Sequence, residues 1–96
     1  MSGIEIIPYD GAKYFTQPEN QRHLLAEAFA SGDRAFIAQA LGTVARARGM
    51  TALAEETGIK RQALYTTLSP NGNPTLDSLL KVLAALKLEL RVEPVG

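Results

Sequence analysis

The sequence predicts a mainly α-helical fold, a bundle of about five helices with a short β-strand near each end of the chain. Apolar residues recur at three- and four-residue steps in several segments, which is typical of helices with one buried face. Glycine and proline separate these segments, and the last residues alternate apolar and charged side chains. The 96 residues, 46% of them hydrophobic and 21% charged, suit a single globular domain.

Residues 1–16 are expected to form a short strand or an extended arm. Residues 4–7 read Ile-Glu-Ile-Ile, a β-leaning pattern that a proline ends. The arm also holds three of the six aromatic residues of the chain, Tyr9, Tyr14 and Phe15. Because an aromatic arm can dock on another protein, these three residues are candidates for partner binding. The equal alternative is that they cover the core.

Two helices are predicted between residues 17 and 49. The first begins at Pro18 and stops at Gly32, which can take the left-handed conformation that ends many helices. Asp33 can then accept a hydrogen bond from the free amides of the next helix, as an N-cap does. Gly49 is expected to end that second helix.

Residues 50–69 have the spacing of two short helices joined by a tight turn and crossed at a steep angle. Ala54 falls where the helices would touch, and Gly58 can supply the positive φ of the turn. Thr51 is the expected N-cap of the first helix. The same spacing fits any helical hairpin, but a DNA-binding helix-turn-helix is the favoured interpretation.

A loop at residues 70–75 leads to a last helix at 76–87. Thr75 is the expected N-cap of this helix. Its apolar face is expected to contain five leucines: Leu76, Leu79, Leu80, Leu83 and Leu86. The alternation at 88–94 predicts a half-buried strand, which could pair with the N-terminal segment or with its own copy across a dimer axis.

Charge both opposes and supports DNA binding. Ten basic and ten acidic residues give a net charge of zero, which counts against strong non-specific affinity for DNA. Residues 44–68 contain four basic and two acidic residues, so the expected DNA face is locally basic. This distribution suits a homodimer, since two copies double the number of phosphate contacts on one DNA molecule.

The composition disfavours an enzyme. With one histidine and no cysteine, the usual pairs of nucleophile and base are missing, and so is the spacing of a metal site, so no cofactor is expected. The lack of cysteine and of a signal-peptide pattern indicates a cytoplasmic protein. No apolar run approaches the roughly 20 residues that span a bilayer, so no membrane association is expected.

Several motifs together carry a family resemblance. They are Tyr9-Asp10, Arg46 to Thr51, Leu53-Ala54, Gly58-Ile59, Leu64-Tyr65, the Asn-Pro loop of Ser69 to Pro74, and the leucine pattern from Leu79 to Leu90. With these motifs the chain resembles the antidote (antitoxin) proteins of bacterial addiction modules, HigA-like members of the XRE or lambda-repressor-like helix-turn-helix class. The resemblance covers roughly Tyr9 to Val95.

The resemblance implies a type II toxin-antitoxin system. Such a protein binds and neutralises a co-encoded toxin of the RelE or HigB kind, and it represses its own operon as a dimer or as a toxin complex. A symmetric dimer would read a pseudo-palindromic operator on double-stranded DNA, with half-sites about 34 to 36 Å apart or multiples of that.

Carried over by position, three residues are expected to contact DNA bases. Arg61 has the planar fork that pairs with guanine, Gln62 has the donor and acceptor that fit adenine, and Thr66 offers a hydroxyl and a methyl group. The expected phosphate contacts come from the same helix and from its neighbours: Arg46, Arg48, Thr51, Lys60, Tyr65 and Thr67. Leu68 departs from the class, because many relatives carry a glutamate there that braces the motif in an ion pair.

Other interpretations stay open. Arg61 and Gln62 could belong to an ordinary solvated helix face, and Tyr65 could cover the edge of the core. The protein could be a stand-alone repressor without a toxin, or an interaction module that has lost DNA binding, which the zero net charge favours.

Overall fold

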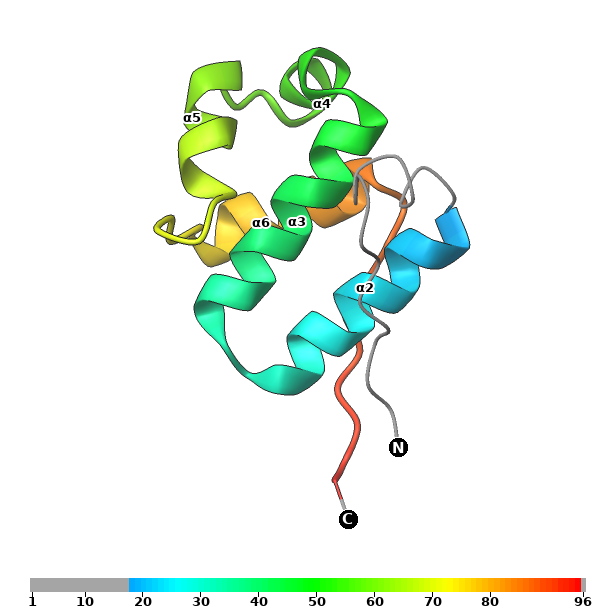
Figure 1. The fold of residues 1–96 in the computed structure, drawn as a ribbon. Helices are drawn as coiled ribbons and strands as arrows, with labels where there is room; N and C mark the ends of the chain where they lie inside the picture. The colour runs from blue at the N-terminus through cyan, green and yellow to red at the C-terminus, as the bar shows by residue number, and fades with distance from the viewer. Residues whose placement is uncertain (1–17, 96) are drawn as a thin grey trace.

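The computed structural model describes residues 18–95, which form five α-helices and, within that range, no β-strand (Figure 1). The helices are α2 (Pro18–Ser31), α3 (Arg34–Arg48), α4 (Met50–Thr57), α5 (Arg61–Thr67) and α6 (Leu76–Ala85). Helices α2 and α3 pack against each other, α4 and α5 lie together at one end, and α6 passes behind α3 (Figure 1). A core of buried aliphatic side chains from every helix joins them, with Leu41 and Val44 of α3 completely enclosed.

The predicted strand at 88–94 is wrong. Residues 88–95 follow α6 in neither a helix nor a strand, although Leu88 packs against the core. Farther along the segment, Val92 and Val95 are 99% and 98% exposed. A strand needs a neighbouring strand to complete its backbone hydrogen bonds, and the segment lies along α2, which cannot supply them. The alternating pattern therefore marks partial burial near the start of the segment and nothing more. The other predicted strand, in residues 1–16, lies outside the described residues.

Two helix N-caps follow from short polar side chains. The Asp33 carboxylate accepts a hydrogen bond from the Ala35 amide at 3.0 Å, and the Thr75 hydroxyl accepts one from the Ser78 amide at 3.0 Å. Both caps satisfy amides that the first turn of a helix leaves without a partner. These two predictions are confirmed.

The predicted N-cap at Thr51 is wrong. Gly49 ends α3 and also precedes α4, with a φ of 109° that favours glycine. Because one residue serves both helices, α4 begins at Met50 and Thr51 already lies within its first turn. The chain therefore changes direction between α3 and α4 at the single residue Gly49.

The apolar face of α6 is rotated from the one predicted. Leu76 and Leu80 are 67% and 49% exposed, whereas Val82, Leu83 and Leu86 are buried. The prediction is wrong at the two exposed leucines because α6 turns its Val82 side toward the core. Leucine periodicity alone cannot show which part of a wide apolar arc meets the other helices.

Glycine 42 allows α3 to approach the end of α5. It is buried, and a Cβ atom there would run into the backbone carbonyl of Leu68. The obstacle is a backbone group, so a larger side chain could only be accommodated by moving the helices apart. Gly72 makes a similar contact with the Thr67 carbonyl, and the Arg34 guanidinium donates to the Gly72 carbonyl at 2.6 Å. The end of α5 is thus held from two sides.

We therefore expect Gly42→Ala to destabilise the protein by about 1 to 3 kcal/mol, despite the higher helix propensity of alanine. Urea unfolding followed by circular dichroism measures the change. Gln39→Ala is the matched control, because Gln39 is exposed on the same helix and its replacement should leave stability nearly unchanged. Equal stability of the two variants would show that the contact between α3 and α5 tolerates a methyl group.

Candidate nucleic-acid interface

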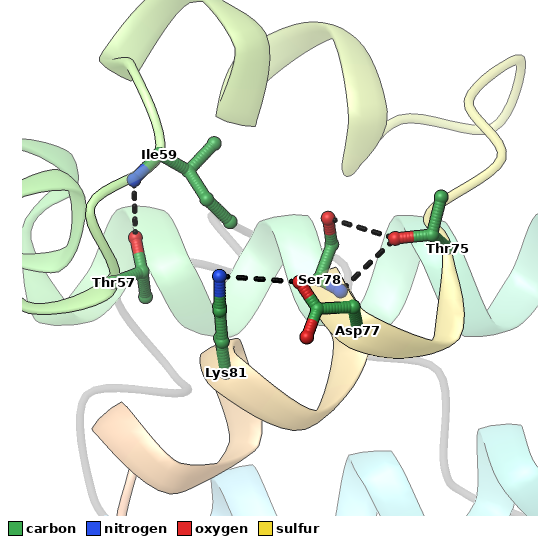
Figure 2. A network of polar contacts seen from close by, with 6 residues as sticks. All are labelled: Thr57, Ile59, Thr75, Asp77, Ser78 and Lys81. Atoms are coloured by element: carbon green, nitrogen blue, oxygen red, sulfur yellow. Dashed lines mark hydrogen bonds and ion pairs between the residues drawn. The ribbon is translucent and has the colours of Figure 1, made fainter.

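Helices α4 and α5 are joined by a turn that three consecutive residues fix. Gly58 has φ 76° and ψ 6°, and its amide donates to the Ala54 carbonyl at 2.9 Å. The Thr57 hydroxyl donates to the Leu53 carbonyl at 2.8 Å and accepts from the Ile59 amide at 3.2 Å. Figure 2 shows this threonine and isoleucine together with the polar groups of α6. The positive φ expected at Gly58 is confirmed, and the hydroxyl of Thr57 closes the turn.

One side of α5 is anchored in the core. Leu64 and Leu68 are 1% and 2% exposed, and the partly buried Ile59 packs against the same cluster. Three leucine or isoleucine side chains spaced along the turn and helix prevent α5 from rolling about its own axis. The opposite side of the helix consequently has a fixed orientation toward solvent.

The exposed side of α5 carries polar and cationic groups. The exposed polar side chains of the helix and of the residue just before it are Lys60, Arg61, Gln62, Tyr65 and Thr66; Ala63 is also exposed, and Thr67 is half-buried at the end of the helix. The guanidinium carbon of Arg61 lies 5.8 Å from the centroid of the Tyr65 ring, close enough for a cation–π contact. Thr66 donates its hydroxyl to the Gln62 carbonyl at 3.2 Å. Five of the predicted contact residues thus lie on one surface, which we call the α5 face.

The α5 face keeps its positive charge available. Within residues 18–95 the ion pairs join Lys81 to Asp77 and Arg91 to Glu89. Neither pair uses Lys60 or Arg61, so both cations of the α5 face are left to interact with an external group. An exposed cation without an internal carboxylate partner is what an anionic ligand requires.

The two arginines at the end of α3 have different surroundings. Arg46 is exposed, and its guanidinium lies beside Gly42. The Leu68 carbonyl at the end of α5 lies beside the same glycine. Arg48 instead donates to the Gln21 side chain at 2.6 Å and to the Leu86 carbonyl at 3.4 Å. Arg46 is therefore placed near α5, while Arg48 ties α2 to the end of α6.

The remaining predicted contact residues lie apart from this surface or outside the described range. Thr51 is exposed in the first turn of α4. Tyr9, Tyr14 and Phe15 fall outside the described residues, so the structure places no predicted toxin contact.

Sequence reasoning missed the roles of Thr57 and Gly42. A threonine before a turn glycine is a known turn-forming residue, so its hydroxyl contact could have been anticipated. The close approach at Gly42 gives no such signal, because the backbone that it meets belongs to a distant part of the chain.

No group of three or more metal-ligating side chains occurs within residues 18–95. None of the helices described is long and apolar enough to cross a membrane.

Over the described residues the chain is a small, all-helical protein with a cationic face on α5. A family model described as "Probable addiction module antidote protein" matches residues 5–94. Because the match spans nearly the whole sequence, the chain belongs to this family of addiction module antidote proteins.

The chain is also similar to an uncharacterized protein of Haemophilus influenzae, with 39% identity over 85 residues that cover 88% of each chain. No solved structure matches the chain. The antidote family expected from the sequence is thus confirmed, whereas its HigA-like, XRE-type subfamily stays a prediction.

We expect Thr57→Val to destabilise the protein by about 1 to 2 kcal/mol, because the Ile59 amide loses its acceptor. Thermal unfolding of the purified protein measures this. Thr43→Val is the matched control, since the Thr43 hydroxyl also donates to a carbonyl of its own helix but is not part of a turn. A loss of stability no larger than that of the control would mean that Gly58 alone holds the turn.

Proposed function

We propose that this protein is the antitoxin of a type II toxin-antitoxin system. In this proposal it binds the operator of its own operon through the α5 face, and it neutralises a co-encoded toxin of the RelE or HigB kind in the cytoplasm. The observation that carries the DNA-binding part is the fixed, outward orientation of Arg61 and Gln62 on a helix whose other side is anchored in the core. Membership of the antidote family supports the toxin partner.

The side chains of the α5 face suit base recognition. A guanidinium fits guanine O6 and N7 with two hydrogen bonds, and a carboxamide fits adenine N6 and N7. The ring of Tyr65 supports the Arg61 guanidinium from one side, which reduces the side-chain freedom lost on binding. In this proposal Arg61, Gln62 and Thr66 read bases from the major groove.

Phosphate contacts would surround the base contacts. Lys60 precedes α5, Tyr65 and Thr67 lie on it, and Arg46 lies near its end. The amide groups around Thr51, in the first turn of α4, offer a further anion contact. Arg48 would have to give up its bonds to Gln21 and Leu86 to reach a phosphate, so its contribution should be the smallest.

A homodimer fits the charge of the chain. The net charge of zero provides little general attraction to DNA, so one copy with a few phosphate contacts would bind weakly. Two copies on a pseudo-palindromic operator would combine both sets of contacts on one ligand. A stand-alone repressor without a toxin partner would use the same dimer. Co-purification with the product of the neighbouring gene distinguishes the antitoxin from such a repressor.

The toxin contact is assigned to the N-terminal arm, with Tyr9, Tyr14 and Phe15 as the residues involved. This assignment rests on the concentration of aromatic side chains, which dominate many protein interfaces.

We expect Arg61→Ala and Gln62→Ala each to weaken specific operator binding by about 1 to 3 kcal/mol. A gel-shift titration with a fragment of the protein's own promoter measures the loss, and circular dichroism checks the fold. Arg22→Ala and Gln39→Ala are matched controls, because these residues are exposed on α2 and α3. Unchanged operator affinity in the Arg61→Ala, Gln62→Ala double variant would refute the recognition-helix assignment.

Deletion of residues 1–16 should abolish toxin association but leave operator binding intact, because the α5 face lies within residues 60–67. Pull-down with the co-expressed toxin and gel shift are measured on the same preparation. Full retention of toxin binding would exclude the arm as the contact.

A further inference from the structure

The centre of the exposed side of α5 is formed by two small side chains. An α-helix turns about 100° per residue, so Thr66 lies about 160° around the helix axis from both Leu64 and Leu68, the leucines that anchor α5 in the core. Thr66 therefore points most directly away from the core. Ala63, three residues earlier, is also exposed and is its neighbour on the helix surface.

The hydroxyl of Thr66 is turned back onto the helix. It donates to the Gln62 carbonyl, one turn earlier, over 3.2 Å. A threonine that bonds its own helix in this way has committed its only proton, so it cannot donate to an oxygen of guanine or thymine without first breaking that bond. The methyl group occupies the other branch of the same Cβ atom. The group that Thr66 offers to a ligand is consequently its methyl.

Two methyl groups thus lie next to each other on α5, the Cβ of Ala63 and the Cγ2 of Thr66, which we call the methyl pair. Cβ atoms three residues apart on a helix are about 5 to 6 Å from each other. Around the helix from Thr66, the next exposed side chain is Gln62. Tyr65 follows, with the Arg61 guanidinium carbon 5.8 Å from its ring centroid. The exposed side of α5 therefore has a small apolar spot beside its polar groups.

We infer that the methyl pair recognises thymine, through contact with the C5-methyl group that this base presents in the major groove. Thymine is the only one of the four DNA bases with a methyl group there, and the methyl groups of alanine and threonine are its usual partners. The inference rests on the proposed function, because it requires α5 in the major groove. It adds the identity of the base that the centre of the helix selects.

A carboxamide beside the methyl pair fits the same choice. Gln62 can pair with the N6 and N7 groups of adenine, and adenine is the Watson–Crick partner of thymine. Both kinds of contact therefore favour A·T base pairs, whereas the guanidinium of Arg61 favours guanine at a neighbouring position. The proposal thus assigns different bases to the centre of α5 and to its first turn.

Deoxyuridine is the matched probe for this contact, because it pairs as thymidine does and lacks only the methyl group. The test compares two forms of the protein's own promoter fragment, one synthesised with thymidine and one with deoxyuridine at every such position. Gel-shift titrations give the ratio of the two affinities. We expect the wild type to bind the thymidine form at least about fourfold more tightly, which corresponds to the burial of one methyl-sized group.

Two variants of the full chain separate the methyl group of Thr66 from its hydroxyl. Thr66→Ser removes the methyl and keeps the hydroxyl, so it should lower the ratio to less than about two. Thr66→Val keeps a methyl and removes the hydroxyl, so it should retain the preference for thymidine DNA. Thr43→Ser is the matched control, since the Thr43 hydroxyl makes the same bond to a carbonyl one turn earlier in α3. Its ratio should equal that of the wild type.

Each ratio compares one protein with itself on two DNAs, so a general loss of affinity or stability in a variant cancels. A difference in shape between the two DNAs would change the ratios of all variants alike. Equal binding of both DNAs by the wild type would overturn the inference and leave the assignment of Arg61 and Gln62 unaffected. It would also be overturned if Thr66→Ser kept the preference or if Thr66→Val lost it. Failure to bind either DNA would remove the proposed function and this inference together.

Discussion

The close contact between Gly42 and the backbone of Leu68 determines where α5 sits. Because a glycine faces the Leu68 carbonyl, α3 and the end of α5 approach more closely than any side chain would allow. Leu64 and Leu68 can then reach the core from a helix of only seven residues. A helix this short has little stability of its own, so its orientation is imposed by packing. The ordered side chains on the α5 face are a consequence of that packing.

Local features of the fold could be predicted from the sequence. The caps at Asp33 and Thr75 and the left-handed turn at Gly58 each depend on residues within a few positions of one another. The chemistry of a short polar side chain or of a glycine is enough to specify them. The exposure of Arg61 and Gln62 followed from the same reasoning, since Gly58 and the buried leucines set the orientation of the helix.

Features that depend on distant partners could not be predicted. The strand pattern at 88–94 could not show that the neighbouring element is a helix, and the leucine pattern of α6 could not show which leucines face solvent. Thr51 lost its predicted role because Gly49, two residues earlier, ends α3 and also caps the start of α4. In each case the local sequence pattern was present, but packing against other parts of the chain determined which structure formed and which side chains were exposed.

Arg48 links three parts of the chain through a single side chain, because α3 carries it, α2 supplies Gln21 and the end of α6 supplies a carbonyl. Replacement of either side chain alone would remove this bond between the buried Gln21 and the exposed Arg48. Among homologous sequences, the amino acids at positions 21 and 48 should consequently vary together. Sequence covariation between these positions would then report on the assembly of the bundle, and it should not be mistaken for a shared role in recognising a ligand.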